Sequence, residues 1–287
     1  MKKMDYKKGE RVKHPGMPEW GLGKVLEDRR DDKVCIFFTG EGRKTLSLKH
    51  VEPLKISGAE AIHPVLDHLW IKEGGESKYQ SLQTSKELFL KDYPDGFYDQ
   101  AYLDGERNGK VAAHELALSL IGPEQLEALL GQKNYEEICK RAIKVVNATK
   151  LIFPNEKLAL RNGLKDSKNM ELFSKNLYHL LYGKEDVAER FISFAKTLEG
   201  IKVGKWTTLS YFLFIVFPEK YIFLKPIVTQ LAAELSAFEI HYRPDLNWRT
   251  YQSVLDFSEY FRSELKDLRP RDMIDIQSFM WGIGPNK

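Results

Sequence analysis

The stretch KWTTLSYFLFIVFPEKYIFLKP, residues 205–226, is the most apolar part of a chain of 287 residues. The uncharged run within it, residues 206–218, is only thirteen residues long, whereas a membrane-spanning helix needs about 20. We therefore expect a buried helix with Thr207 or Thr208 as its N-cap. Pro218 should end it, because proline cannot continue a helix. A helix that is apolar on nearly every side must be covered by other elements, so the stretch predicts the core of a helical domain.

Segments with helical spacing surround this stretch in the sequence. The expected helices lie at residues 59–70, 110–121, 123–131, 135–148, 155–163, 169–182, 185–199, 226–238 and from 247 onward. Pro123 is expected in a first turn, and Asn155 is expected as an N-cap. A last short helix is expected to return Ile274, Phe279 and Trp281 to the core.

Residues 6–56 have a different pattern, made of short alternating segments that are typical of strands. The expected strands lie near residues 6–13, 21–27, 33–38, 45–48 and 51–56. Five short strands in about fifty residues is the size of an SH3-like or Tudor-like barrel. The sequence therefore predicts an α+β protein of two domains, a small barrel at residues 1–57 and a mainly helical domain at residues 58–287. Residues 73–78 are expected to form a loop and residues 91–109 an ordered connection.

The charge distribution and the number of cysteines indicate which kinds of partner and metal site to expect. The chain carries 44 Lys/Arg and 41 Asp/Glu, a net charge of +3 that does not by itself indicate nucleic acid. Residues 1–56, however, hold 14 basic and 9 acidic residues, an excess of +5. Cys35 and Cys139 are too few for a zinc site and are expected to be buried free thiols. No apolar segment typical of a secretion signal begins the sequence, so we expect a cytoplasmic protein without a membrane anchor.

The N-terminal segment combines VKHPGMPEWGLGKVLE with KVCIFF and KTLSL. This combination resembles a small bacterial domain family of unknown function. It is also similar to the C-terminal Tudor-like domain of UvrD/PcrA-type helicases, in which a His-Pro pair precedes a Gly-x-Gly-x-Val strand. Here HP occupies residues 14–15 and GLGKV residues 21–25. The resemblance implies a module that docks on nucleic acid or RNA polymerase, although the helicase motor is absent and the insertion at residues 17–20 departs from the helicase pattern.

Basic and aromatic residues of this segment are the predicted surface for nucleic acid or a partner, since cations contact phosphates and aromatic rings stack on bases. The predicted set is Lys13, His14, Trp20, Arg29, Arg30, Arg43, Lys44 and Lys49. A structural alternative stays open. The glycines at 21 and 23 would then only permit a tight turn or bulge, Trp20 would only cap the barrel, and the charges would only be solvated.

The carboxylates Asp272 and Asp275 are the nearest approach to a catalytic pair. Three residues apart on a helix, they share a face, and Arg269 and Arg271 lie nearby in the sequence. A divergent metal-dependent nuclease could use such a pair. The alternative is helix capping, because Pro270 is expected to start a helix at whose N-terminus aspartate is favoured. The sequence predicts no other metal site and no cofactor.

A second candidate groove flanks the apolar helix. Its predicted residues are Lys205, Trp206, Lys225, Trp248 and Arg249, with Tyr242 and Arg243 beside them. Lysines and aromatic rings could bind bases or a peptide, or they could close the end of a helical bundle. The FPEKY segment and the late DxQSFxW motif resemble accessory regions of bacterial restriction and phage-defence proteins.

These patterns predict a non-enzymatic adaptor that docks through the N-terminal barrel on nucleic acid or on its transcription or repair machinery, with RNA polymerase as one candidate. Two alternatives stay open. One is a divergent metal-dependent nuclease or phage-defence enzyme that uses Asp272 and Asp275. The other is a protein-interaction module in which the barrel binds a peptide.

Overall fold

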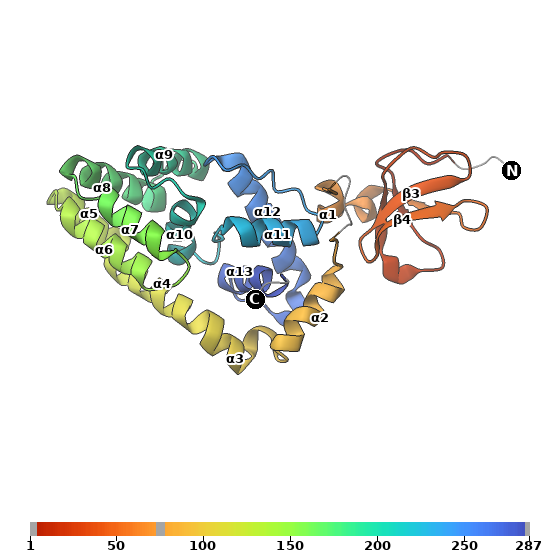
Figure 1. The fold of residues 1–287 in the computed structure, drawn as a ribbon, viewed down its shortest axis with the longest axis horizontal. Helices are drawn as coiled ribbons and strands as arrows, with labels where there is room; N and C mark the ends of the chain where they lie inside the picture. The colour runs from red at the N-terminus through yellow and green to blue at the C-terminus, as the bar shows by residue number, and fades with distance from the viewer. Residues whose placement is uncertain (1–4, 73–77, 285–287) are drawn as a thin grey trace. The chain divides into compact units, whose positions relative to one another are not determined.

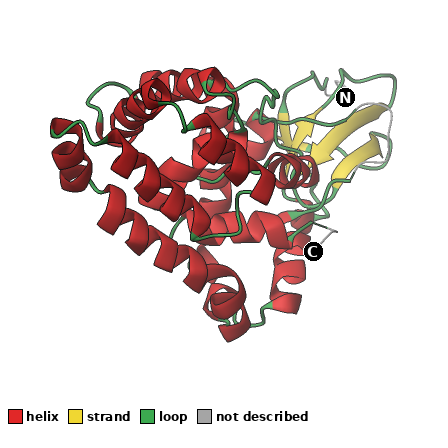
Figure 2. Ribbon diagram, turned by 60° about the vertical axis from the view of Figure 1, so that its left-hand side comes forward, coloured by secondary structure: helices red, strands yellow, loops and turns green. Residues whose placement is uncertain are grey.

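The computed structural model of the chain describes residues 5–72 and 78–284. These residues form two compact units (Figure 1). The N-terminal unit contains residues up to 91 together with residues 231–239, and the helical unit contains residues 92–230 and 240–282. The named strands belong to the N-terminal unit (Figure 2), which confirms the predicted α+β class. The predicted domain boundary after residue 57 stays a prediction.

A five-stranded antiparallel sheet in the order β4-β3-β2-β1-β5 forms the base of the N-terminal unit. Its strands are β1 (Arg11–Lys13), β2 (Leu22–Val25), β3 (Lys33–Phe38), β4 (Gly42–Ser47) and β5 (Leu54–Ile56). The expected strand at residues 33–38 coincides with β3, and the others are shorter than or shifted from their expected ranges. Since β4 and β5 are the two edges of the sheet, its closure into a barrel stays a prediction.

The register of β3 against β4 assigns side chains to the two faces of the sheet. Ile36 is paired with Lys44 and Phe37 with Arg43, and paired residues point to the same side while neighbours in a strand alternate. Lys44 therefore lies on the face of Ile36, whereas Arg43 lies on the opposite face. The Ile36 face carries the core of the unit, formed by Tyr6, Val12, Val25, Val34, Ile36, Phe38 and Leu46.

The two glycines of the Gly-x-Gly motif, Gly21 and Gly23, lie where a side chain would not fit. Gly21 has a φ of 69°, and a Cβ there would lie 2.4 Å from the Thr39 hydroxyl. A Cβ on Gly23 would lie 2.7 Å from the Ile36 Cγ2 atom. Both positions therefore require the absence of a side chain for the turn and for close packing, as the structural alternative predicts.

The expected helix at residues 59–70 is wrong. Two short segments replace it, the 3-10 helix η2 (Gly58–Ala61) and α1 (Pro64–Asp67). His63 between them has extended geometry, with φ −154° and ψ 121°, because the residue before a proline is pushed out of the helical region. The unit continues with α2 (Leu82–Asp92). Most of the expected loop at 73–78 lies outside the described residues.

Residues 231–239 complete the N-terminal unit although they are distant in sequence. The Trp70 N–H donates to the Ala237 carbonyl at 3.0 Å, and the Gln80 N–H donates to the Leu235 carbonyl at 2.8 Å. The His68 ring stacks on Phe238 with a centroid distance of 5.1 Å.

The helical unit surrounds α10 (Trp206–Val216), of which every residue is buried. Helices α4, α8 and α9 contact α10. The helices of this unit are α3 (Gln100–Tyr102), the π-helical turn η4 (Leu103–Arg107), α4 (Asn108–Ile121), α5 (Pro123–Gly131), α6 (Tyr135–Asn147), α7 (Pro154–Gly163), α8 (Ser167–Tyr182), α9 (Val187–Gly200), α10, α12 (Trp248–Glu264) and α13 (Met273–Gly282), with the short 3-10 helices η3 (Gly96–Tyr98) and η5 (Lys266–Leu268). Helix α11 (Pro226–Leu235) crosses the division between the units.

Helix α10 contains polar groups that are satisfied internally. The Tyr211 hydroxyl donates to the Val145 carbonyl at 2.8 Å. The Ser210 hydroxyl donates to the Trp206 carbonyl at 2.8 Å and accepts from the Leu224 N–H at 2.9 Å. These bonds remove the cost of burying unsatisfied polar groups. They also fix the chain that returns after Pro218 against the helix.

The ends of several helices differ from the expected ones. Helix α10 ends before Pro218 as expected, but its N-cap is Lys205, so the prediction of Thr207 or Thr208 is wrong. Helix α7 begins at Pro154, and the Glu156 carboxylate accepts from the N–H of Phe153, so the cap predicted at Asn155 is wrong. In both helices the true N-cap lies two or three residues before the polar residue that the pattern favours.

The boundaries of two further segments also differ from the expected ones. The connection expected at residues 91–109 becomes helical from residue 100, because the Asp99 side chain accepts from the N–H of Ala101 at 2.9 Å and caps α3. The last helix starts at Met273 and not at Pro270. Its residues Ile274 and Phe279 are buried as expected, whereas Trp281 is only half-buried.

Among the described residues, no helix combines the length and the apolar character that a membrane crossing requires. The apolar α10 is a core element of the helical unit.

Both cysteines are free thiols, but only Cys139 is fully buried, at 3% exposure. Burial raises the pKa of the Cys139 thiol to about 11. Because the thiolate is the reactive form, we expect iodoacetamide at pH 8 to alkylate Cys139 on the order of a hundredfold more slowly in the folded protein than in urea. Peptide mapping by mass spectrometry measures both rates. Equal rates in the two states would contradict the burial of this thiol.

Candidate functional site

An aromatic and cationic surface lies at the edge of the N-terminal core; we call His14, Trp20, Phe38 and Lys44 the Trp20 surface. The ring centroids of His14 and Trp20 are 4.8 Å apart, and those of Trp20 and Phe38 are 5.2 Å apart. The Lys44 Nζ atom lies 5.4 Å from the centroid of the Trp20 ring, within the range of a cation–π contact. Trp20 is half-buried, with one part packed on the core.

Local geometry positions these side chains. Of residues 17–20, which depart from the helicase pattern, Pro18–Trp20 form the 3-10 helix η1 and Met17 is its N-cap. The Gly40 N–H donates to the Trp20 carbonyl at 2.9 Å, and a Cβ on Gly40 would lie 2.2 Å from the Glu19 carbonyl oxygen. The Gly16 N–H donates to the His14 Nδ1 atom at 3.1 Å. When His14 is neutral, its proton is therefore on Nε2.

Each predicted basic residue of the N-terminal segment has a carboxylate within 4 Å. The pairs and their N–O distances are Lys13–Glu60 at 3.8 Å, Arg29–Asp32 at 3.3 Å, Arg30–Glu27 at 3.3 Å, Arg43–Glu27 at 3.7 Å, Lys44–Glu41 at 3.0 Å and Lys49–Asp32 at 3.7 Å. Most of these pairs are exposed, and exposed pairs contribute little free energy. The pairs can therefore open for a stronger ligand, but they reduce the positive potential of the surface.

The structure does not gather the eight predicted residues into one patch. Arg30, Arg43 and Lys49 line a concave surface of about 490 Å³ on the face opposite to Lys44. Its charged lining residues are four acidic and four basic, namely Glu27, Asp28, Asp31, Asp32, Arg30, Lys33, Arg43 and Lys49. A lining without net charge does not favour a phosphate backbone. Among the predicted residues, His14, Trp20 and Lys44 are the ones brought into mutual contact.

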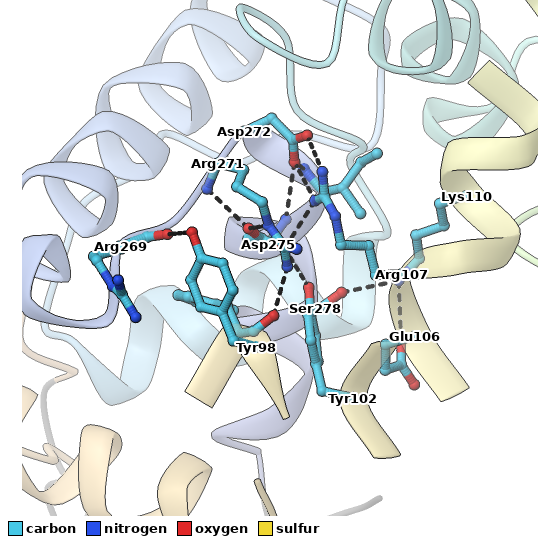
Figure 3. A network of polar contacts seen from close by, with 12 residues as sticks. Tyr98, Tyr102, Glu106, Arg107, Lys110, Arg269, Arg271, Asp272, Asp275 and Ser278 are labelled. Carbon is cyan, nitrogen blue, oxygen red and sulfur yellow. Dashed lines mark hydrogen bonds and ion pairs between the residues drawn. The ribbon is translucent and has the colours of Figure 1, made fainter. Parts of the chain in front are cut away.

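In the helical unit, Asp272 and Asp275 do lie together, as predicted, but within a network of ion pairs (Figure 3). Asp275 is 0% exposed. Its carboxylate accepts from the Tyr102 hydroxyl at 2.6 Å, from Arg107 Nη1 at 2.9 Å and from Arg271 Nε at 3.0 Å. The Arg271 backbone N–H adds a further bond at 2.8 Å. Both oxygens of Asp275 are therefore occupied by donors of the same chain.

Asp272 has a double role in this network. Its two oxygens accept from Arg107 Nη1 at 2.8 Å and Arg107 Nη2 at 2.7 Å, a bidentate pair. The same side chain accepts from the N–H of Ile274 at 3.0 Å and so caps α13. The guanidinium groups of Arg269 and Arg271 each lie 4.7 Å from the ring centroid of Tyr98 (Figure 3).

The pKa shifts of Tyr102 and Arg107 are those expected for closely paired groups. Burial, followed by the charge of Asp275, raises the pKa of the Tyr102 hydroxyl well above its ordinary value. Burial alone would lower the pKa of Arg107, but the hydrogen bond to Asp272 and the charge of Asp275 raise it. In the part of the chain that the structure describes, no group of carboxylates, histidines and cysteines is arranged to hold a metal ion. The arrangement favours the capping alternative over an open catalytic pair.

The residues of the second predicted groove do not share one surface. Trp206 is 3% exposed, and its Nε1–H donates to the Arg243 carbonyl at 3.0 Å. Phe191 contacts both Trp206 and Trp248, with centroid distances of 6.3 and 5.3 Å. This aromatic cluster favours the alternative in which the residues close the end of the bundle. Lys205 and Arg249 are exposed.

Lys225 lies in other surroundings, where its Nζ atom is 4.8 Å from the ring centroids of both Phe153 and Trp281. Neither ring was selected from the sequence as a binding residue, because no local pattern connects positions so distant along the chain. The same holds for Arg107 and Tyr102, which lie more than a hundred residues before Asp272.

Comparison with known proteins gives one finding on the N-terminal segment. Residues 6–56 match the model of a family described as a protein of unknown function (DUF3553). The match agrees with the predicted resemblance to a small domain of unknown function and covers less than half of the chain. No curated protein and no solved structure matches the sequence.

Proposed function

We propose that the N-terminal unit is a docking module that binds single-stranded nucleic acid through the Trp20 surface, without catalysing a reaction. The observation that carries this proposal is the Lys44 ammonium 5.4 Å from the ring centroid of a half-buried tryptophan, beside the His14 ring. An aromatic ring stacks on a base with about 1–3 kcal/mol. A lysine next to it contacts the adjacent phosphate, so the two groups together match one nucleotide of a strand.

The same proposal extends to the fold and the partner of the N-terminal unit. The open sheet would act as an SH3-like or Tudor-like barrel, related to the docking domain of UvrD/PcrA-type helicases. Its nucleic acid would be presented by transcription or repair machinery, with RNA polymerase as one candidate partner. The short antiparallel sheet with its Gly-x-Gly strand supports this relationship.

The ion pairs of the N-terminal segment predict a weak dependence on salt. For a single strand, the logarithm of the binding constant falls by about 0.7 per logarithmic unit of salt for each phosphate contact. With one lysine, Lys44, at the Trp20 surface, we expect a slope of about −0.7. A long basic groove would give a much steeper slope.

Fluorescence anisotropy with the full chain tests the proposal. Labelled single-stranded DNA, single-stranded RNA and duplex DNA are titrated at several salt concentrations. We expect Lys44→Met to flatten the salt slope by about 0.7 and Trp20→Leu to weaken binding by about tenfold or more. Lys33→Met, on the mixed-charge concave surface, is the matched control and should bind as the unchanged protein does. Circular dichroism of each variant shows whether the fold is intact.

Three results would overturn the proposal. One is the absence of salt-dependent binding to any of the nucleic acids. Another is a folded Trp20→Leu variant with unchanged affinity. A third is equal loss of affinity in Lys33→Met and Lys44→Met, which would place the site elsewhere. If protein partners are captured in the presence of nuclease while nucleic acid does not bind, a peptide-binding module is favoured.

A further inference from the structure

A cavity of about 410 Å³ lies in the helical unit, next to the ion-pair network of Asp275 but outside it. Four segments form it, namely the η4–α4 turn, the loop between α6 and α7, the residue before α11, and α13. Its lining includes Gly105, Lys110, Lys150, Lys225, Gln277 and Trp281, together with the carboxylates of Asp104 and Glu106. Its volume lies within the range of about 300–1,000 Å³ that is common for small-molecule sites.

One wall of the cavity is irregular backbone. Residues 103–107 form the π-helical turn η4, and such turns are frequent at functional sites. Gly105 in this turn and Gly109 in the first turn of α4 both line the cavity, and beyond the adjacent backbone no atom lies within 4 Å of the position a Cβ would take in either. The backbone at both positions is therefore accessible to a ligand.

Gln277 supplies an unused polar group. It lines the cavity, is 5% exposed, and its Oε1 atom has no hydrogen-bond partner among the described residues. A buried acceptor without a partner costs free energy. The Oε1 atom itself is shielded from solvent, so a ligand that presents an N–H group would remove this cost once the amide turns toward the cavity. Because a carboxamide carries an acceptor and a donor side by side, it matches the edge of a nucleobase.

The cations of the cavity are of two kinds. Lys110 is 8% exposed, and its Nζ atom donates to Glu106 at 3.0 Å and to Ser278 at 2.9 Å (Figure 3). Lys150 and Lys225, in contrast, form no ion pair with a carboxylate within residues 5–72 and 78–284. Lys225 is held over the Trp281 ring instead. Glu106 is paired with Lys110, and Asp104 is the other carboxylate of the lining. Two ammonium groups without an ion pair of their own, next to an aromatic ring, are suited to an anion attached to a planar group.

We infer that this cavity is a binding site for a nucleoside monophosphate. The heterocycle lies against Trp281, and an N–H group of its edge donates to the Gln277 Oε1 atom. The phosphate contacts the ammonium groups of Lys225 and Lys150. This inference rests on the helical unit alone and does not depend on the proposed function of the N-terminal unit.

Isothermal titration calorimetry of the full chain tests the site with AMP, GMP, CMP and UMP, the matching nucleosides, and inorganic phosphate. We expect at least one monophosphate to bind with a Kd below about 1 mM, its nucleoside to bind at least about tenfold more weakly, and phosphate alone to give no measurable heat. The bound monophosphate should also raise the melting temperature of the helical unit.

Two variants separate the parts of the site. Gln277→Leu removes the unpaired amide, so it should leave stability unchanged or raise it while weakening the monophosphate by about tenfold or more. Lys225→Met should weaken the monophosphate toward the affinity of the nucleoside, with Lys150 as the remaining cation for the phosphate. Lys196→Met is the matched control, an exposed lysine on α9 that does not line the cavity, and it should bind as the unchanged protein does.

The inference is overturned if none of the four monophosphates binds at a ligand concentration of about 5 mM. It is also overturned if folded Gln277→Leu and Lys225→Met proteins both retain full affinity. Binding of inorganic phosphate as tight as that of the monophosphate would reduce the cavity to an anion site and would equally contradict a nucleotide site.

Discussion

Replacement of Asp275 by asparagine is expected to lower the free energy of unfolding by about 3–5 kcal/mol. The carboxylate is fully buried and accepts hydrogen bonds from Tyr102, Arg107 and Arg271. An asparagine keeps the size of the side chain but removes the charge. This leaves Arg271 without a carboxylate and Arg107 with Asp272 alone, in a poorly solvated site. Urea denaturation followed by circular dichroism at 222 nm measures the loss.

Two further variants test whether the loss of stability comes from the ion-pair network. Asp245→Asn changes an exposed aspartate of the same unit and should alter stability by no more than about 0.5 kcal/mol. Arg271→Gln should cost at least about 1 kcal/mol less in the Asp275→Asn background than in the unchanged protein, because its partner is already lost. If Asp275→Asn costs under about 1 kcal/mol, the network does not stabilise the fold as we infer.

Phe212→Ala is expected to destabilise the helical unit by a similar amount, about 3–5 kcal/mol. The Phe212 ring is fully buried in the middle of α10 and contacts Phe173, Phe194 and Tyr211, with centroid distances of 6.1, 6.0 and 5.8 Å. Truncation removes apolar contacts and leaves a cavity that rings from three helices cannot easily fill. The same denaturation experiment measures this effect.

Leu158→Ala is the control for the loss of an apolar side chain, because Leu158 on α7 is 55% exposed. We expect it to change stability by about 0.5 kcal/mol or less. A Phe212→Ala protein as stable as this control would show that α10 is not the centre of the core. A melting curve with two separate transitions in the unchanged protein would require each unit to be analysed separately.

Sequence patterns predicted the long helices and the clearest strand, because both depend on local features. Strand β3 coincides with its expected range, and α12 starts after Asn247, whose side chain accepts from the Thr250 N–H at 2.8 Å. Helical spacing gave a wrong prediction where a proline lies within the expected helix. Pro64 divides the expected helix at 59–70 because the residue before it must be extended. None of the expected helices corresponds to α2.

Site geometry was predictable only in part. The spacing of Asp272 and Asp275 correctly placed them together, since it depends on three residues of one helix segment. Their partner Arg107 is 165 residues away from Asp272 and has no sequence signal. The predicted basic patch failed to form one surface for a different reason. Adjacent residues such as Arg43 and Lys44 point to opposite faces of a strand, and which face is the core depends on strand pairing.

The inclusion of residues 231–239 in the N-terminal unit has a consequence for synthesis on the ribosome. The sheet of residues 11–56 can form as soon as it emerges, since its register needs no later segment. The backbone donors of Trp70 and Gln80 must wait for carbonyls that are translated more than 150 residues later. Nascent chains stopped before residue 231 would therefore carry a paired sheet followed by an unfinished segment, and this segment would be the expected target of chaperones and proteases during translation.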